Sequence, residues 1–343
     1  MAYIVFFLSG CAALIYEMIW FRQLGLIFGN TVHAAATVLT AFMTGLAWGS
    51  WYFGRKADSF RNPLKVFGVL ELAIGFFAVS VPFWLMISQV IYRWFYQNVS
   101  SSLLLLTGLR FALSFLILLL PTFCMGGSLP VLTRHLLSDS KGFSRKIGWL
   151  YGVNTVGAVV GTYLGGFVLI PLIGVQHSFN LAVAISLSAG LIAVAVSFKC
   201  RLPQPLEPSV PAAEVRAVSR SAREWIYLIG MAIEGFVAMG LEVIWFRALI
   251  LTYGSNTYSF SVVLIVFLAG TAIGAACLGW IAGRVKNLLW LLAVTQLVLG
   301  VYIIASLYWY DAQPEFLLEY CRVRGLSWNT MMTARFLITL KFL

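Results

Sequence analysis

Seven ionisable residues and one amide lie inside long apolar stretches of the chain, where charged side chains are costly to bury. In chain order they are Glu17, Arg22, Glu71, Arg110, Glu242, Arg247, Gln296 and Arg335. In a protein that crosses a membrane, such residues face the bundle interior and pair with each other or contact a solute. The chemistry they offer is binding of a small cationic or zwitterionic solute, or mutual neutralisation in a structural clasp.

Glu17 shares one face of its predicted helix with small and aromatic residues. The stripe has spacings of three and four and consists of Gly10, Ala13, Glu17, Trp20 and Leu24. Small residues let a second helix approach closely, and the carboxylate is expected to face the bundle interior.

Depth in the membrane suggests a partner for this carboxylate. Glu17 lies about 20 Å from the start of its helix, and Arg110 lies about 10 Å from the opposite membrane face. Because the two depths are measured from opposite faces of a core of about 30 Å, they place both residues at the same level. We therefore predict an ion pair between Glu17 and Arg110, which Glu242 and Arg335 would repeat.

The remaining polar residues of this set are expected to lie in different environments. Arg22 is about 140° round the helix from Glu17, so it should reach the outer interface rather than pair with it. Arg247 occupies the matching place later in the chain. Glu71 corresponds to Gln296, and this asymmetry makes Glu71 the better candidate for a function-specific group.

The composition of the chain indicates the class of protein in which these residues lie. The chain has 343 residues, of which 61% are apolar and 10% charged. Soluble domains are about 25% charged, so a soluble globular, disordered or disulfide-rich protein is excluded. The net charge of +11 is expected in loops at the membrane surface rather than on a nucleic-acid-binding face. Five scattered cysteines indicate no metal site, and no catalytic or cofactor-binding residues are expected.

A span needs about 20 apolar residues. Predicted helices cover 3–27, 32–54, 64–92, 103–136, 146–172, 176–198, 225–252, 257–281 and 287–310, and a tenth begins near Asn329. The tenth still reads as apolar at Leu343, so the second half is expected to be truncated. A proline-rich interval, 201–224, reads as a cytoplasmic linker between an N-terminal half, 1–200, and the start of a C-terminal half, 225–343.

Lysine and arginine gather in alternate connections. The connections after the second, fourth, sixth and eighth helices are rich in them, which predicts a cytoplasmic N-terminus. The connection 310–328, with Arg322 and Arg324, departs from this pattern. Asp58 is expected to meet a basic residue in the loop after the second helix.

The chain resembles itself at an offset of 225 residues. SGCAALIYEMIWFRQLGLIFGNT at 9–31 matches EGFVAMGLEVIWFRALILTYGSN at 234–256, and the ungapped matches continue from Phe42 with Phe267 to Arg110 with Arg335. A repeated unit of six helices enters the membrane from the same side each time. The sequence therefore predicts an all-α polytopic bundle of two parallel six-helix repeats, the plan of major-facilitator transporters.

Two further motifs concern packing. Gly157, Gly161 and Gly165 form a stripe that favours close helix contact rather than dinucleotide binding. PTFCMGGSLPVL at 121–132 is expected to kink or break the fourth helix.

Four runs together resemble the membrane bundle of the spermidine-synthase-like membrane proteins. They are SGCAALIYEMIWFRQLGLIFGNT, FMTGLAWGSWYFGRKAD, PTFCMGGSLPVLTR and LYGVNTVGAVVGTYLGGFVLIPLIG. The resemblance implies a multi-pass inner-membrane protein connected with polyamines. In that family a major-facilitator-like bundle is fused to a soluble aminopropyltransferase domain, which a full-length version would be expected to carry. No segment of this chain resembles that enzyme domain, so no active-site residue is carried over.

Three hypotheses for function stay open. The chain is a membrane domain linked to polyamine synthesis or handling, a secondary transporter of a small cation or zwitterion, or a non-transporting scaffold. A glycine-rich strand–turn–helix with acidic residues downstream would favour the first. Uptake lost in Glu17→Gln or Glu71→Gln would favour the second, and loss of folding without any uptake would favour the third.

Overall fold

The computed structural model is helical throughout the part of the chain that it describes. That part covers residues 1–29, 31–99, 102–136, 143–199, 222–253, 256–282, 288–311 and 313–325, with 327, 330–331, 333–334 and 337. The predicted all-α class is confirmed for these residues. Their contacts form two compact units, Met1–Ile244 and Trp245–Leu343, which are described separately as the N-terminal and C-terminal units.

The N-terminal unit contains the six long helices predicted for the first half. They are α1 (Ala2–Phe28), α2 (Val32–Lys56), α3 (Pro63–Asn98), α4 (Leu103–Leu136), α5 (Phe143–Tyr163) and α6 (Ile170–Ser197). A short 3-10 helix, η1 (Ala57–Ser59), follows α2, and a π-helical segment, η2 (Leu164–Leu169), joins α5 to α6. The next helix, α8 (Ala222–Tyr253), extends past the boundary between the units.

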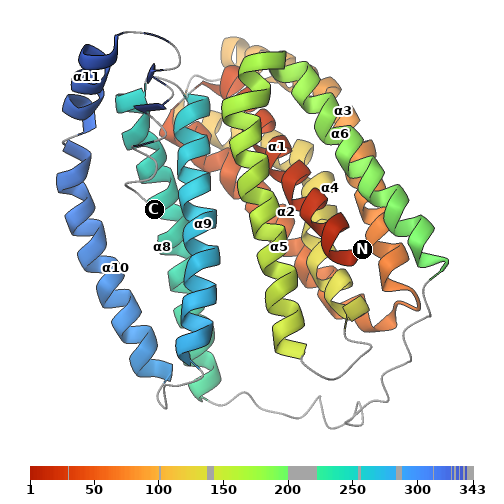
Figure 1. Ribbon diagram of the computed structural model, residues 1–343. Helices are drawn as coiled ribbons and strands as arrows, with labels where there is room; N and C mark the ends of the chain where they lie inside the picture. The colour runs from red at the N-terminus through yellow and green to blue at the C-terminus, as the bar shows by residue number, and fades with distance from the viewer. Residues whose placement is uncertain are drawn as a thin grey trace. The chain divides into compact units, whose positions relative to one another are not determined.

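Local sequence signals explain where several of these helices begin. The Thr31 side chain accepts a hydrogen bond from Ala34 N at 3.1 Å and caps α2. The Asn62 side chain caps α3 in the same way, and Pro63 occupies the first helical position. Gly174 has a φ of 79°, a left-handed conformation that glycine adopts easily, and it interrupts the helical geometry of α6. Figure 1 shows α5 and α6 running in opposite directions and diverging from the segment that joins them.

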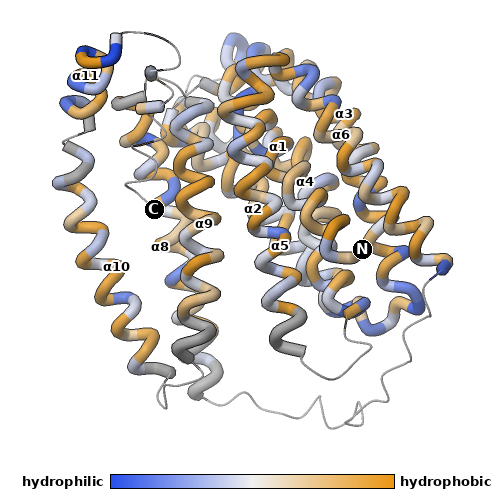
Figure 2. Tube along the Cα trace, viewed as in Figure 1, coloured by the Kyte–Doolittle hydropathy of each residue, from blue (hydrophilic) through white to orange (hydrophobic). Residues whose placement is uncertain are grey.

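The described helices are long and apolar enough for a multi-pass membrane protein. Eight helical segments have the length and composition of a membrane span. One of them, Ile147–Ser197, has 51 residues and contains the interruption at Gly174, so its length fits two crossings. Hydrophobic residues cover most of the helices, and many of the hydrophilic ones lie near helix ends (Figure 2).

Helix α1 lies at the centre of the N-terminal unit. It packs mainly on α5 and α6, whereas α2 packs along α4, and α3 packs on both α4 and α6. Every residue from Ile15 to Phe21 is buried, as expected for a helix that is apolar all round. The interior therefore surrounds α1 on all sides at this level, not only along the predicted stripe.

The glycine stripe of α5 does form the predicted close-packing face. A Cβ atom at Gly157 would overlap Phe7 O, and one at Gly161 would overlap Cys11 O. The backbones of α1 and α5 thus approach more closely than any larger residue allows.

The fourth helix is not broken, and the predicted kink stays a prediction. Helix α4 continues from Leu103 to Leu136 with Pro121 and Pro130 inside it. Membrane helices tolerate proline where neighbouring helices compensate for the lost backbone bond. Here α2 lies so close that a Cβ at Gly126 would overlap Leu46 O, and this packing supports the proline-containing segment.

The C-terminal unit contains the end of α8 with α9 (Asn256–Ala282), α10 (Leu288–Asp311) and α11 (Gln313–Arg324). Tyr310 on α10 donates a hydrogen bond to Ala248 O on α8 at 2.7 Å. The 310–328 interval, predicted as a plain connection, contains helix α11. Most of the predicted tenth helix from Asn329 lies outside the described residues. The predicted repeat of the two halves stays a prediction.

Candidate functional site

Glu17 is a buried carboxylate without a partner in the described part of the chain. Its side chain is 5% exposed, and Oε1 accepts no hydrogen bond. It lies about 22 Å along α1 from Ala2, in the middle of a span. Leaving an ionised carboxylate unpaired in such a place is strongly unfavourable, so the group must hold a proton or contact a cation.

Arg110 does not supply that cation. Its Nε and Nη2 donate to the hydroxyl oxygen of Tyr92 on α3, at 3.1 and 2.7 Å. The remaining nitrogen, Nη1, is buried without a hydrogen-bond partner. The predicted ion pair between Glu17 and Arg110 is therefore wrong.

The register of α1 against α4 explains the error. Ser9 on α1 and Ser128 on α4 both donate to Glu71 Oε1, so these two serines lie at the same level. Glu17 is about 12 Å beyond Ser9, whereas Arg110 is about 27 Å beyond Ser128 in the same direction. The arginine is thus about 15 Å from the level of the carboxylate. The predicted depths of Glu17 and Arg110 were counted from helix ends that were assumed to lie at the membrane faces. Helix α4 has 34 residues and is longer than the membrane core, so its end does not mark the membrane face.

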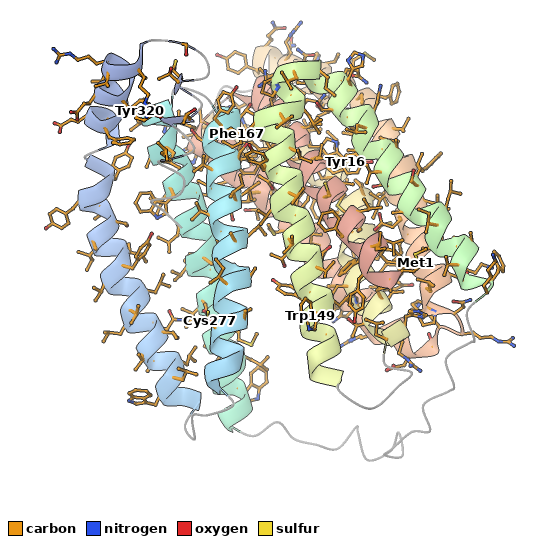
Figure 3. The ribbon with its side chains drawn as sticks, viewed as in Figure 1. Met1, Tyr16, Trp149, Phe167, Cys277 and Tyr320 are labelled. Carbon is orange, nitrogen blue, oxygen red and sulfur yellow. The ribbon has the colours of Figure 1, made fainter. Side chains whose placement is uncertain are left out.

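Further unpaired polar atoms accompany Glu17 along α1. Trp20 Nε1 and Gln23 Oε1 are buried without a hydrogen-bond partner, and the buried Tyr16 Oη faces the side chain of Ser186 on α6. Tyr16, Trp20 and Gln23 follow i, i+4, i+7 spacing, and Glu17 lies about 60° round the helix from Trp20. Figure 3 labels Tyr16 on α1, inside the N-terminal unit. Buried polar atoms are nearly always paired in proteins, so this polar stripe, Tyr16–Glu17–Trp20–Gln23, is suited to a ligand or water.

Aromatic rings pack on two members of this polar stripe, Tyr16 and Trp20. Tyr16 and Trp20 stack with centroids 5.0 Å apart and an interplanar angle of 12°. Phe179 on α6 lies 5.9 Å from Tyr16, and Phe42 on α2 lies 6.5 Å from Trp20. A carboxylate next to aromatic faces is a combination that attracts organic cations.

Glu71 is the second buried carboxylate and has hydroxyl partners. It is 1% exposed and accepts a hydrogen bond from Ser9 at 2.5 Å and a longer one from Ser128 at 3.4 Å. The contacts join α3 to α1 and α4. Because both partners are neutral, this carboxyl group too has no compensating positive charge among its hydrogen-bond partners.

The other predicted residues fall into different settings. Arg22 and Arg247 are exposed, as expected for side chains that reach an interface. Glu242 is 3% exposed and its Oε1 has no hydrogen-bond partner, whereas Gln296 is exposed. Arg335 and its predicted pair with Glu242 lie outside the described residues.

An ion pair joins a buried arginine of α4 to an exposed aspartate in η1, between α2 and α3. Arg134 Nε on α4 lies 3.1 Å from Asp58 Oδ1 in η1. The expectation that Asp58 meets a basic residue is confirmed. Because Asp58 is 79% exposed, solvent screens the pair even though Arg134 is buried.

Sequence reasoning missed Tyr92, Ser9 and Ser128. A usable signal existed for Tyr92, since it lies six residues before the end of α3 and Arg110 lies seven residues after the start of α4. The contacts of Ser9 and Ser128 depend on helix register, which periodicity alone does not determine.

Within the described residues, no three His, Cys, Asp or Glu side chains gather in a way that could hold a metal ion. Comparison with known proteins finds no matching protein-family model, no matching curated protein and no matching solved structure. The class that the fold supports is a multi-pass helical membrane protein.

Proposed function

We propose that this protein binds a small organic cation, such as a polyamine, inside its N-terminal bundle and moves it across the membrane. The observation that carries the proposal is Glu17, a buried acid in mid-span with no partner among the described residues. A solute amine would supply the missing positive charge, and its N–H groups would pair with the acceptor oxygens of Glu17 and Gln23.

The surroundings of Glu17 favour an organic amine over an inorganic ion. The stacked rings of Tyr16 and Trp20 offer aromatic surface, which attracts alkylammonium groups and packs against their methylene chains. Small metal ions prefer several oxygen ligands around one point, and the polar stripe instead extends along the helix.

A purely structural clasp is less consistent with this arrangement. That hypothesis required Glu17 to be neutralised by Arg110, and Arg110 instead binds Tyr92. An unpaired buried carboxylate lowers stability without fixing the fold, so a solute-binding role gives it a reason to be there.

The resemblance to spermidine-synthase-like membrane proteins is compatible with this proposal and makes polyamines the first solutes to test. Under the hypothesis that the resemblance implies, the bundle supplies polyamines to an aminopropyltransferase domain or removes them from it. The proposal of cation binding does not depend on that link, because it is based on the residues of α1.

The test is uptake of radiolabelled putrescine or spermidine into proteoliposomes that contain the purified chain. We expect saturable uptake by the wild type and a fall of about 10- to 100-fold in apparent affinity for Glu17→Gln, the scale of a lost charge-assisted hydrogen bond. Glu315→Gln is the matched control, because Glu315 is exposed on α11. Uptake that is equal in wild type and Glu17→Gln would contradict the proposal, and so would its complete absence from folded wild type.

A further inference from the structure

Arg110 keeps part of its guanidinium group unused in a buried place. The residue is 8% exposed, and Nη1 has no hydrogen-bond partner. Within the described residues, no carboxylate forms an ion pair with it. A buried positive charge without a negative partner is as unfavourable as the reverse, so this nitrogen is expected to have an anionic partner that the described residues do not provide.

Ser114 provides an independent observation one helical turn away. It is 0% exposed, and its Oγ has no hydrogen-bond partner. Most serines and threonines in these helices bond back to a carbonyl of the preceding turn, as Thr122 does to Leu118 O at 2.6 Å. Ser114 does not bond back to Arg110 O, so its hydroxyl is left for something else.

These two unpaired groups lie on one face of α4. Residues four apart on a helix are neighbours, so Arg110 and Ser114 can reach one small ligand together. Tyr92 binds the guanidinium through Nε and Nη2 and thereby fixes its plane. Phe28, at the end of α1, packs edge-on against Tyr92 with centroids 5.2 Å apart and an interplanar angle of 66°.

The chemistry of this set differs from that of the polar stripe on α1. Arg110 Nη1 can only donate, Ser114 donates readily, and Tyr92 still has a hydroxyl hydrogen because it accepts from the arginine. A group of donors around a positive charge selects an anion. A carboxylate fits best, because one oxygen can accept from Nη1 while the other accepts from the hydroxyl.

We infer that Arg110, Ser114 and Tyr92 form an anion site for a small carboxylate near the end of the bundle where α3 joins α4. Arg110 lies about 15 Å from the level of Glu17, whereas Ser114 lies at the level of Gln23, so the anion site adjoins one end of the polar stripe. It uses other side chains and does not rest on the amine proposal.

The test is thermal unfolding of the purified chain in nanodiscs, in a low-salt buffer with increasing sodium acetate, sodium chloride or sodium phosphate. We expect acetate to raise the midpoint of unfolding in a saturable way, because a ligand bound only by the folded state stabilises it. The shift should vanish in Arg110→Gln and persist in Arg93→Gln, since Arg93 is exposed beside Tyr92 on α3. Arg93→Gln also controls for general salt effects.

A second variant covers a failure of Arg110→Gln to fold. Ser114→Ala keeps the guanidinium and removes one donor, so the apparent acetate affinity should fall about 5- to 10-fold. Equal acetate shifts in wild type and Arg110→Gln, or equal affinities in wild type and Ser114→Ala, would overturn the site. A saturable shift with chloride or phosphate but none with acetate would overturn the carboxylate assignment.

Discussion

Glu17, Glu71 and Arg110 illustrate how buried charge is managed at the scale of single residues. Glu71 has two hydroxyl partners, Arg110 has one phenol, and Glu17 has no hydrogen bond at Oε1. The three groups lie at successive levels of one bundle, because Glu17 is about 12 Å beyond Ser9 and Arg110 about 15 Å further. These three charges are thus distributed along the axis of the bundle instead of pairing with one another.

The short contact between Ser9 and Glu71 leads to a prediction on stability. Ser9→Ala removes the 2.5 Å hydrogen bond and leaves a buried acceptor with only the longer bond from Ser128. The free energy of unfolding should fall by about 1–3 kcal/mol, the cost of an unsatisfied buried group. Chemical denaturation in detergent measures this change.

Ser128→Ala provides the comparison for this prediction. Its bond to Glu71 is 3.4 Å long, so its loss should cost well under half as much as that of Ser9. If Ser128→Ala destabilises the protein more than Ser9→Ala, the account of this cluster is wrong.

At the scale of helices, the contact between α1 and α5 depends on glycine. A methyl group at Gly161 would overlap Cys11 O on α1, which is backbone and cannot move aside easily. By contrast, a methyl group at Gly152 on the same helix would have nothing within 4 Å of it. Close helix packing therefore requires glycine at position 161 but not at position 152.

This difference gives a matched pair of variants. Gly161→Ala should lower the free energy of unfolding by about 1–3 kcal/mol, because it forces α1 and α5 apart. Gly152→Ala should leave stability unchanged or raise it by up to about 1 kcal/mol, since alanine favours the helix. Denaturation of both variants under one condition tests the pair, and equal destabilisation would contradict the close approach.

Helices were easier to predict than their register. Apolar runs and the turn residues Asn62, Pro63 and Gly174 determine where helices begin and end, and the six predicted helices of the first half are present. Glycine spacing on α5 indicated a packing face because small residues act locally. The Glu17–Arg110 pair failed because it depends on how α1 and α4 slide past each other, and the sequence contains no direct measure of that offset.

At the scale of the whole molecule, orientation in the membrane is the main open prediction. Lysine and arginine counts place the α2–α3 connection in the cytoplasm and the α3–α4 connection outside. Single cysteines at Arg61 and Val99, which are both exposed in these connections, would report the two sides. In a background without native cysteines, a membrane-impermeant maleimide should label Val99→Cys on intact cells and Arg61→Cys only after lysis. The reverse pattern would show the opposite orientation.

The predicted duplication also belongs to this scale. A parallel repeat requires Glu242 to lie at the same depth in its half as Glu17 does in the first, and Glu242 too is buried with an unpaired Oε1. If the duplication holds, Glu242→Gln should weaken amine uptake as Glu17→Gln does, measured in the same proteoliposome assay. Uptake unchanged in Glu242→Gln would restrict the amine site to the N-terminal half.

The absence of a protein cation beside Glu17 can be tested most directly by a double-mutant cycle with Arg110. The free energy of unfolding is measured for wild type, Glu17→Gln, Arg110→Gln and the double variant. Because the two groups lie about 15 Å apart in level, their effects should add to within about 0.5 kcal/mol. A favourable coupling of about 2 kcal/mol or more would show that the two charges neutralise each other and would contradict this account.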